Sequence, residues 1–335
     1  MKTQVVYSDI FNKHDNIGHP ENSQRTMVMI QALQSSSLKE KIDIIEPVLF
    51  PAESLSEIHN ERMIQAVRDI SETQDSWLDL DTYVCKDDFE TARFAAGSTV
   101  QLCNNILKGK ADNGFALVRP PGHHATSKTS MGFCLFNNAS LAANELLKKK
   151  KKVLIFDPDV HHGNGTQDIF YNSDQVMYQS FHLSPHFPGT GKIEEIGKGD
   201  GLGYTINAPL GYGNGDKAVS SLMGEIFIPI ARQFRPDFII VSSGFDSHHA
   251  DPLGGLRMTV DMYGKIIEQL LSVQSKLVCT LEGGYNLSII GKCFLSQLGA
   301  LSGTPQSYPD SINESNSSRP VIEKIKKKMR QYWKL

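Results

Sequence analysis

Residues 153–167, VLIFDPDVHHGNGTQ, contain the transition that decides the fold class. The first four residues are apolar, and the segment that follows is rich in Asp, His and Gly. A short apolar run of this kind is typical of a strand that is buried on both faces of a parallel sheet. Ligands of α/β proteins bind at the carboxyl ends of such strands, where the polar segment begins. We therefore expect a buried parallel sheet with a functional site at its edge.

Four more apolar runs lead directly into polar clusters. They are GFALV (114–118) before RPPGHHA, VMYQSF (176–181) before HLSPHFPGTG, DFIIVSS (237–243) before GFDSHHADPLGG, and KLVCTL (276–281) before EGGYN. Helix-like stretches precede or separate these runs at 89–107, 137–147 and 224–234. Alternating strands and helices predict a single α/β domain, and a parallel sheet would bring all five polar clusters to one edge.

The composition excludes several classes of protein. The chain has 335 residues, of which 34 are basic and 37 acidic, and 40% are hydrophobic, which excludes a collagen, a coiled coil or a disordered chain. No stretch approaches the ~18 apolar residues of a membrane span, and the N-terminus does not have the pattern of a signal peptide. A net charge of −3 gives no general attraction to nucleic acid. We expect a cytoplasmic protein that contacts neither membranes nor nucleic acid directly, and the sequence leaves open whether it forms an oligomer.

The cysteines form no C-x-x-C pair. We therefore expect reduced and mostly packed thiols, rather than a disulfide framework or a zinc finger. They are Cys85, Cys103, Cys134, Cys279 and Cys293.

The C-terminal end of the chain differs from the rest. Residues 304–320, TPQSYPDSINESNSSRP, are polar and turn-rich, and residues 321–335 predict a short basic helix with its charges in solvent. An electrostatic contact between this helix and an acidic partner is the alternative. We predict a domain over residues 1–303 that carries all the polar clusters. Residues 304–335 would form a polar linker and a helix that packs on this domain or extends from it.

Asp157, Asp159 and His161 stand two residues apart, so in an extended segment their side chains share one face. Two carboxylates and an imidazole in this arrangement need a cation, and the set suits zinc or iron. Asp246 can supply a further ligand from a neighbouring strand. We predict that Asp159, His161 and Asp246 bind a metal, with one position open for water. The alternative is that the aspartates cap loops and His161 packs in the core, which accounts for one carboxylate but not for three motifs together.

His123 and His124 are candidates for acid–base chemistry. An open metal site needs a base that deprotonates water and an acid that protonates the leaving group, and histidine performs either role near neutral pH. Asp157 and Asn164 are the expected partners of these rings. An Asp favours the charged imidazolium, whereas an Asn leaves its histidine neutral more readily. The alternative, a pair of satisfied core or loop histidines, is less favoured because the pair stands at a strand end beside a metal motif.

Tyr285 follows two glycines in LEGGYN. Gly283 and Gly284 allow the backbone to approach a ligand closely, and a tyrosine hydroxyl presented there can donate to a developing oxyanion. The same three residues also form ordinary turns, so this motif indicates a catalytic role only in combination with the metal and histidine motifs.

Together these motifs resemble the zinc-dependent histone deacetylase and acetylpolyamine amidohydrolase superfamily. The resemblance runs from about Tyr7 to Ala300. The matching segments, in order, are HPENSQR (19–25), LDLDTYV (78–84), RPPGHHA (119–125), GFCLFNN (132–138), DPDVHHGNGTQ (157–167), FPGTG (187–191), GFDSHHADPLGG (244–255) and LEGGYNL (281–287). LEGGY, and Asn164 where class I enzymes carry Asp, are closer to the class II and prokaryotic branches. The resemblance implies an arginase-like α/β fold with a central, mostly parallel sheet of about eight strands.

The resemblance also implies roles for the motif residues. The implied zinc ligands are Asp159, His161 and Asp246, and the implied catalytic residues are His123, His124, Asp157, Asn164 and Tyr285. The segment SHHAD after Asp246 lacks the extra aspartates of two-manganese arginases, which favours a single metal. A structural potassium ion is implied at Asp157, Asp159, His161, Ser180 and Phe181.

A narrow acyl-lysine channel is the remaining implication. Phe133 and Phe187 would form its two walls, and Asp81 would hydrogen-bond the substrate backbone at the rim. Gly132, Leu253 and Gly283 match further channel positions.

The implied reaction is hydrolysis of an acyl amide on a lysine side chain of a protein or peptide, most simply acetyl-lysine. The nearest alternative is an acetylpolyamine amidohydrolase acting on a small acetylated amine. Leu253 stands where the specialised polyamine deacetylase has an acidic residue, which favours lysine substrates, although Glu21 or Asp81 can supply charge at the rim. A non-catalytic acyl-lysine reader is a hypothesis of another class. We rank it lowest, because a decayed site would have lost a ligand, a histidine or the tyrosine.

Overall fold

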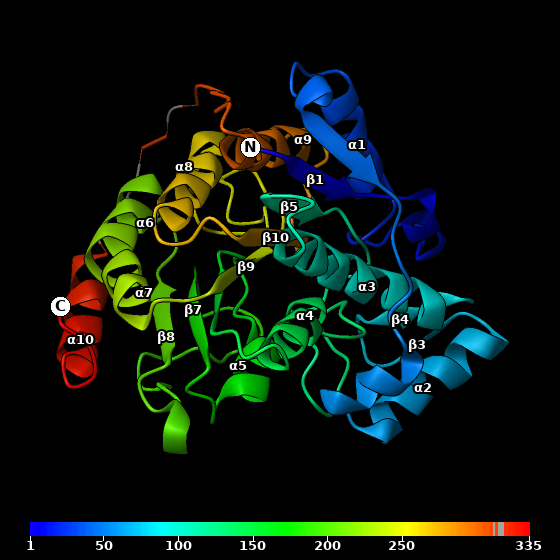
Figure 1. Cartoon of the computed structure of the whole chain (residues 1–335), viewed down its shortest axis with the longest axis horizontal. Coiled ribbons are helices and arrows are strands. Elements are labelled where there is room, and N and C mark those ends of the chain that lie inside the picture. The colour runs from blue at the N-terminus through cyan, green and yellow to red at the C-terminus, as the bar shows by residue number, and fades with distance from the viewer. Residues whose placement is uncertain (311, 314–317) are drawn as a thin grey trace.

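Parallel strands form the centre of the molecule (Figure 1). The computed structural model describes residues 1–310, 312–313 and 318–335, and within them eight strands form one sheet in the order β2-β1-β5-β10-β9-β6-β7-β8. Neighbouring strands are all parallel. The strands are β1 (Thr3–Val6), β2 (Ile42–Ile45), β5 (Asn113–Ala116), β6 (Val153–Asp157), β7 (Val176–Leu183), β8 (Thr205–Leu210), β9 (Phe238–Ser243) and β10 (Leu277–Leu281). The predicted fold class is confirmed.

The predicted strands occupy the middle of the sheet as β5, β10, β9, β6 and β7. Three further strands, β1, β2 and β8, were not predicted, and they lie toward the two edges. Their sequences, TQVV, IDII and TINAPL, mix polar with apolar residues. In β2 the polar mixture reflects exposure, since Asp43 and Ile44 face solvent. The strand β1 is buried, and its polar side chains are paired: the Thr3 hydroxyl donates to Asn113 Oδ1 at 2.7 Å and Gln4 Nε2 donates to Asp43 Oδ2 at 3.0 Å.

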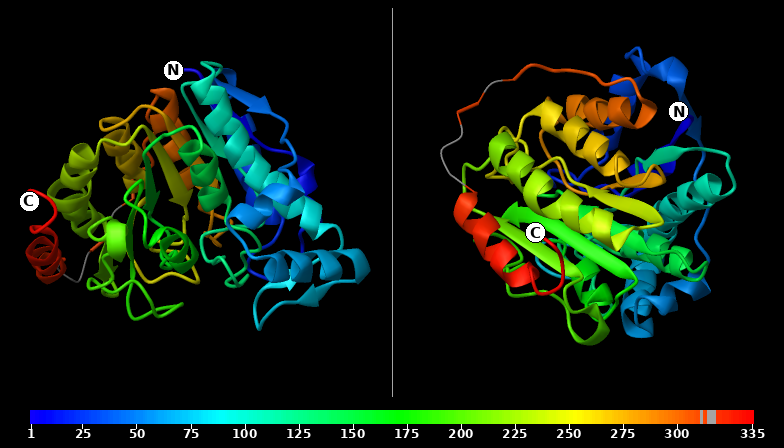
Figure 2. Two further views of the ribbon diagram at one scale, coloured as in Figure 1. Left: turned by 60° about the horizontal axis from the view of Figure 1, so that its bottom comes forward. Right: turned by 60° about the vertical axis from the view of Figure 1, so that its left-hand side comes forward.

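Helices cover both faces of the sheet (Figure 2). In β6, Leu154 and Phe156 pack into one hydrophobic cluster, and Val153 and Ile155 pack into the other. This alternation follows from the two-residue period of a strand, and it requires an apolar layer on each side. The first cluster contains residues of α1 (Gln24–Gln34), α6 (Asp216–Leu222), α7 (Ile228–Phe234), α8 (Val260–Leu271), α9 (Ile290–Ser302) and α10 (Arg319–Met329). The second contains residues of α2 (Glu61–Thr73), α3 (Asp88–Leu107), α4 (Asn138–Leu147) and α5 (Asn164–Phe170).

The predicted helices are present with small changes. Residues 89–107 and 137–147 correspond to α3 and α4, whereas the stretch predicted at 224–234 is divided into a π-helical turn, Met223–Phe227, and α7. A small antiparallel hairpin, β3 (Ser76–Trp77) and β4 (Tyr83–Val84), lies outside the main sheet.

The C-terminal helix α10 packs on β8 and the π-helical turn (Figure 1). Its residues Ile322, Ile325 and Met329 are buried, while Lys326 pairs with Glu225 at 2.5 Å. The helix is thus a packed element with a charged outer side. Part of the predicted polar linker, residues 311 and 314–317, lies outside the described residues.

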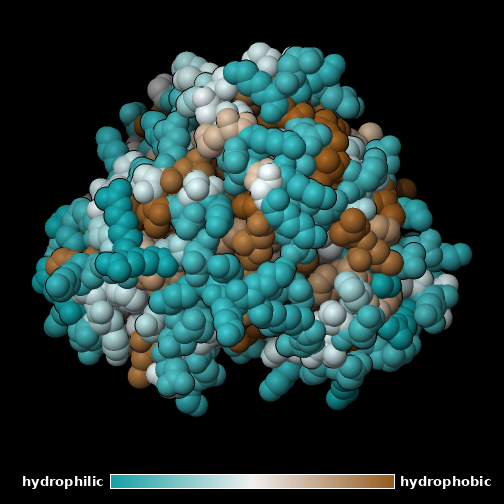
Figure 3. Space-filling view, in the orientation of Figure 1, coloured by the Kyte–Doolittle hydropathy of each residue, from teal (hydrophilic) through white to brown (hydrophobic). Residues whose placement is uncertain are grey.

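The surface is polar over most of the face seen in Figure 3, with hydrophobic residues in small patches. Among the described residues no helix has both the length and the apolar character needed to cross a membrane. All five cysteines are buried and unpaired, as the sequence predicts.

Gly97 in α3 provides a test of how closely the 48–50 segment packs on this helix. A Cβ at Gly97 would lie 1.9 Å from the Val48 carbonyl oxygen. Alanine normally stabilises a helix interior by ~1 kcal/mol relative to glycine, but here we expect Gly97→Ala to destabilise the protein by about 1–3 kcal/mol. Urea unfolding measures the difference. Gly224→Ala is the control, because no atom lies within 4 Å of that Cβ and no loss is expected; equal stability of both variants would contradict the packing argument.

His59 gives the fold a pH-dependent contribution to stability. Its Nδ1 lies 2.8 Å from the Thr126 carbonyl oxygen and its Nε2 accepts the Asn137 N–H at 3.0 Å, so the buried ring is neutral. Burial lowers the pKa of His59 to about 4, although the Thr126 carbonyl acts in the opposite direction. Because the folded pKa is below the unfolded one, this stabilisation is complete above pH ~6.5 and is lost as the pH falls toward 4.

We expect the wild type to lose about 2–3 kcal/mol through this group between pH 7 and pH 4.5. Urea unfolding of the wild type and His59→Gln at both pH values measures the loss, which should be smaller in the variant. Equal losses in the two proteins would show that His59 does not titrate in this range.

Candidate active site

A narrow cavity of about 200 Å³ lies at the carboxyl edge of the sheet. Loops that follow β5, β6, β7, β9 and β10 all contribute to it, together with the β3–β4 hairpin. The convergence of the polar clusters that the sequence predicts is therefore observed. The cavity is lined by Asp81, His124, Gly132, Phe133, His161, His186, Phe187, Leu253 and Tyr285.

Asp159, His161 and Asp246 bring three possible metal-ligand atoms together. His161 Nδ1 lies 3.0 Å from Asp159 Oδ1 and 3.2 Å from Asp246 Oδ2. Both carboxylates are fully buried, and Asp246 Oδ2 receives no hydrogen bond from the described residues. A buried carboxylate oxygen without a donor is costly unless a cation compensates it. The residues therefore fit a metal ion.

Glycines make room for these carboxylates. A Cβ at Gly244 would lie 2.0 Å from Asp159 Oδ2, and a Cβ at Gly283 would lie 2.0 Å from Asp246 Oδ2. The Gly283 N–H donates to Asp159 Oδ2 at 2.9 Å, and the Val160 N–H donates to Asp246 Oδ1 at 2.8 Å. The backbone thus fixes both carboxylates and leaves Asp246 Oδ2 available.

Asp157 has a different environment from Asp159. Its Oδ2 accepts a hydrogen bond from the Tyr178 hydroxyl at 2.9 Å and lies 3.2 Å from His123 Nδ1. Ser180, another of the five residues predicted at a potassium site, is its neighbour in the parallel register of β6 and β7. These two members of the predicted set are therefore adjacent, and the potassium site itself stays a prediction.

The tandem histidines have partners of different charge. His123 Nδ1 faces Asp157, whereas His124 Nδ1 lies 2.8 Å from Asn164 Oδ1. Burial alone would lower the pKa of His123, but the Asp159 and Asp157 carboxylates outweigh it and raise this pKa to about 10. Burial, His123 and His161 hold the pKa of His124 well below its usual value. With its Nδ1 proton directed at Asn164, His124 keeps a lone pair on Nε2.

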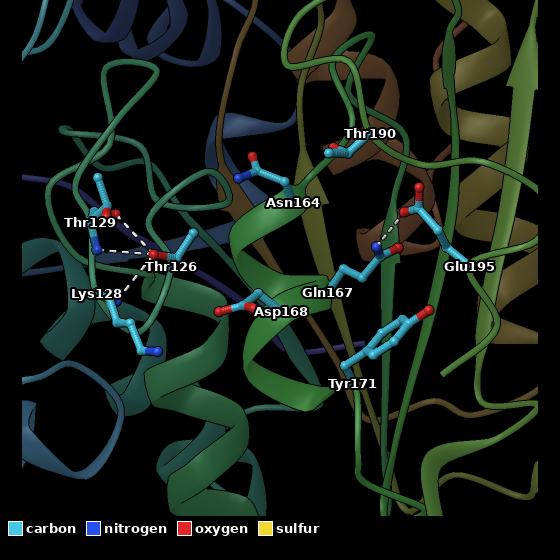
Figure 4. A pocket seen from close by; sticks show the side chains of 9 residues that line it. All are labelled: Thr126, Lys128, Thr129, Asn164, Gln167, Asp168, Tyr171, Thr190 and Glu195. Carbon is cyan, nitrogen blue, oxygen red and sulfur yellow. Dashed lines mark hydrogen bonds between the residues drawn. The ribbon is translucent and has the colours of Figure 1, made fainter. Parts of the chain in front are cut away.

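Asn164, the partner of His124, also lines a second cavity of about 470 Å³. Figure 4 shows Asn164 at the start of α5, between the loop of Thr126 and Thr129 and the side chains of Thr190 and Glu195. Asn164 is partly exposed, whereas Asp157 is fully buried. The partners of the two histidines therefore differ in hydration as well as in charge.

Tyr285 lines the channel between an aromatic ring and a cation. Its ring meets Phe133 edge-on at 5.9 Å, and the Arg25 guanidinium carbon lies 4.9 Å from the ring centroid. Burial raises the pKa of the Tyr285 phenol well above its ordinary value, so the hydroxyl keeps its proton and can donate it in a hydrogen bond. Gly284 precedes it with φ +111°, a conformation that favours glycine.

Two residues of the site were not singled out from the sequence. His186 stacks on His161 with a centroid distance of 4.9 Å, and its Nε2 lies 3.1 Å from the Leu253 carbonyl oxygen. Glu282 is buried and accepts the N–H groups of Gly122 and His123 at 2.7 and 3.0 Å. Both residues stand in polar clusters that directly follow strands, and this position is the sequence feature that indicates a site residue. Neither residue has a characteristic spacing to a partner, so the sequence does not indicate its role.

The prediction that Glu21 can supply charge at the rim is wrong. Glu21 is fully buried, and its carboxylate contacts Arg25 at 2.8 Å and Arg119 at 2.5 Å. The two guanidinium groups hold it inside the protein, because a buried carboxylate is stable only when it is paired. Asp81 is the acidic residue that lines the channel.

Comparisons with known proteins agree with this geometry. Residues 19–301 match the family described as histone deacetylase domain. A probable deacetylase of Archaeoglobus fulgidus is 34% identical over 100% of this chain and 99% of its own length. Histone deacetylase 5 of Arabidopsis thaliana is 36% identical over 99% of this chain, which spans 54% of that protein. The crystal structure of the HDA15 HD domain has a TM-score of 0.92 at 33% identity and covers 99% of this chain and 95% of its own.

The archaeal relative is consistent with the prokaryotic-like branch that the sequence indicates. With a family match from residue 19 to residue 301 and the same α/β fold as a deacetylase domain, the chain belongs to the histone deacetylase family of hydrolases.

Proposed function

We propose that this protein is a zinc-dependent deacylase that removes an acetyl or other acyl group from a lysine side chain. The observation that supports this proposal is the channel, whose lining combines the aromatic rings of Phe133 and Phe187 with the polar groups of His124, His161 and Tyr285. Aromatic walls suit the methylene chain of an acyl-lysine, and the polar groups suit its amide.

Asp159, His161 and Asp246 would hold the metal. These ligands suit Zn²⁺, and Fe²⁺ accepts the same set. When bound, the metal would polarise the acyl carbonyl and acidify a water molecule. A structural K⁺ would be held by Asp157, Asp159, His161, Ser180 and Phe181.

His124 is the proposed general base and then the general acid. Its Nε2 lone pair accepts a proton from the attacking water as the carbonyl carbon becomes tetrahedral, while its Nδ1 proton stays on the Asn164 hydrogen bond. The imidazolium formed in this way then gives its Nε2 proton to the departing amine as the C–N bond breaks. His123, paired with Asp157, carries a positive charge that stabilises the negative charge of the tetrahedral species.

The channel residues orient the substrate. Tyr285 donates from its hydroxyl to the developing oxyanion, and the Asp81 carboxylate accepts a backbone N–H of the substrate at the rim. Gly132 and Gly283, which have no side chain, let the backbone approach the substrate closely. Leu253 provides an apolar rim beside Phe187, which favours a lysine in a protein or peptide over a polycationic amine.

We also propose that residues 1–303 form the catalytic domain and that residues 304–335 are a polar connection and a helix packed on it. The Trp333 Nε1–H donates to the Gly203 carbonyl oxygen at 2.7 Å, which supports the packing. A cytoplasmic location and the absence of nucleic acid or membrane contacts belong to the same proposal.

The first test is a deacylation assay of zinc-loaded protein with acetyl-lysine peptide and acetylspermidine in parallel. We expect peptide cleavage that a hydroxamate inhibits, that chelation abolishes and that added Zn²⁺ restores, because Asp159, His161 and Asp246 are arranged for a metal. A clear preference for acetylspermidine would favour an acetylpolyamine amidohydrolase. A folded, metal-loaded protein without activity on any acyl-amine would favour the reader.

Tyr285→Phe tests the oxyanion role. Loss of one donor of this kind lowers turnover by about 10²–10³-fold, and we expect a fall of this size in kcat with unchanged zinc content. The steady-state rate and the bound metal are measured on the same preparation. Turnover close to that of the wild type would exclude a role for the hydroxyl in the transition state.

A further inference from the structure

The segment that presents Tyr285 is held from two sides by residues outside the proposed catalytic set. On one side, Arg25 Nε donates to the Gly284 carbonyl oxygen at 2.7 Å, and another nitrogen of Arg25 donates to the Glu282 carbonyl oxygen at 2.5 Å. On the other side, the Asp251 carboxylate accepts backbone N–H groups. The backbone around Tyr285 is therefore fixed through both its donors and its acceptors.

Asp251 has three backbone donors. Its Oδ2 accepts the Tyr285 N–H at 2.6 Å and the Asn286 N–H at 3.1 Å, and its Oδ1 accepts the Leu253 N–H at 3.0 Å. The residue is only 9% exposed. Hydrogen bonds to a carboxylate are stronger than bonds between neutral groups, and they are stronger still away from water.

The loop that contains Asp251 also carries two other parts of the site. It follows β9, includes Asp246, one of the proposed metal ligands, and reaches Leu253 in the channel wall. The Asn286 side chain ties the same two loops together, because its Nδ2 donates to the Ala250 carbonyl oxygen at 2.7 Å. The separation between the metal ligand and Tyr285 is thus set by bonds between these loops.

We propose that Asp251 is a positioning residue that fixes the Tyr285 hydroxyl relative to the metal ligands and so controls turnover. The proposal depends on the proposed function, in which that hydroxyl donates to the oxyanion. Two glycines precede Tyr285 and allow many backbone conformations, so the hydrogen bonds of Asp251 select one of them. A displacement of about 1 Å at a reacting group can lower the rate by as much as ~10²-fold.

A purely structural role is the competing hypothesis. Asp251 could serve only its own turn, through the bond to the Leu253 N–H. Its loss would then change stability or the channel wall, and the effect would not depend on the Tyr285 hydroxyl. A double-mutant cycle separates the positioning role from the structural one, because residues that act through one another are not additive.

The test uses Asp251→Asn, which keeps the shape of the side chain and removes its charge. In the full-length, zinc-loaded protein we expect kcat to fall by about 10–100-fold, with KM changed less than about threefold. In a Tyr285→Phe background the same substitution should lower kcat less than about twofold, since the hydroxyl that it positions is already absent. Amide hydrogen exchange of residues 283–287 should become faster in Asp251→Asn.

Asp261→Asn is the matched control. The Asp261 carboxylate also accepts a backbone N–H, from Tyr308 at 2.6 Å, and the Ser307 hydroxyl at 2.8 Å, but these donors are not on the Tyr285 segment. Its kcat should equal that of the wild type. If Asp251→Asn does not fold, Asn286→Ala removes the parallel bond to Ala250, and we expect a ~3–10-fold fall in kcat that disappears in the Tyr285→Phe background.

Two outcomes would overturn the positioning role and leave the proposed function intact. In the first, Asp251→Asn lowers kcat by the same factor in the wild-type and Tyr285→Phe backgrounds. In the second, Asp251→Asn has wild-type kcat although Tyr285→Phe is impaired. Wild-type kcat in Tyr285→Phe would overturn the oxyanion role and the positioning role together.

Discussion

Two buried carboxylates that face one imidazole nitrogen are the constraint on which this site depends. Burial and the charge of Asp159 raise the pKa of Asp246 to about 7, while the neighbouring His123 and His161 overcome burial and lower the pKa of Asp159. Such a pair is stable only if a positive charge is shared between its members. The segments after β6 and β9 bring the two aspartates together. Their carboxylates lie so close to Gly244 and Gly283 that neither glycine position has room for a side chain.

The loop after β5 carries an asymmetry between His123 and His124, whose partners lie at the end of β6 and the start of α5. One ring faces a buried aspartate and the other a partly exposed asparagine. A carboxylate stabilises an imidazolium much better than an amide does, so adjacent residues of one loop have opposite tendencies to bind a proton. Glu282 holds this loop by accepting the His123 N–H. A single chain segment therefore provides both a fixed charge and a group that can exchange a proton.

The sequence predicts these features to different extents. The central strands and the polar clusters at their ends follow from local pattern, because a short apolar run before Asp, His and Gly is typical of a buried strand that ends at a ligand site. The edge strands, the burial of Glu21 and the contact of Asp251 with Tyr285 could not be predicted in this way. Each depends on a partner far away in the sequence: Glu21 meets Arg119, and Asp251 meets a residue 34 positions later.

Glu21 shows why such long-range contacts matter for the site. Its carboxylate joins Arg119 to Arg25, and Arg25 in turn holds the backbone at Gly284. Burial would raise the pKa of Glu21, but Arg119, His14 and Arg25 outweigh it and hold this pKa well below its usual range. Buried ion pairs add little net stability, yet removal of one partner costs about 3–5 kcal/mol. The network therefore acts as a geometric restraint. It holds the carbonyl groups of the segment whose N–H groups are bound by Asp251, so that Tyr285 in the channel wall and the proposed metal ligands keep one relative position.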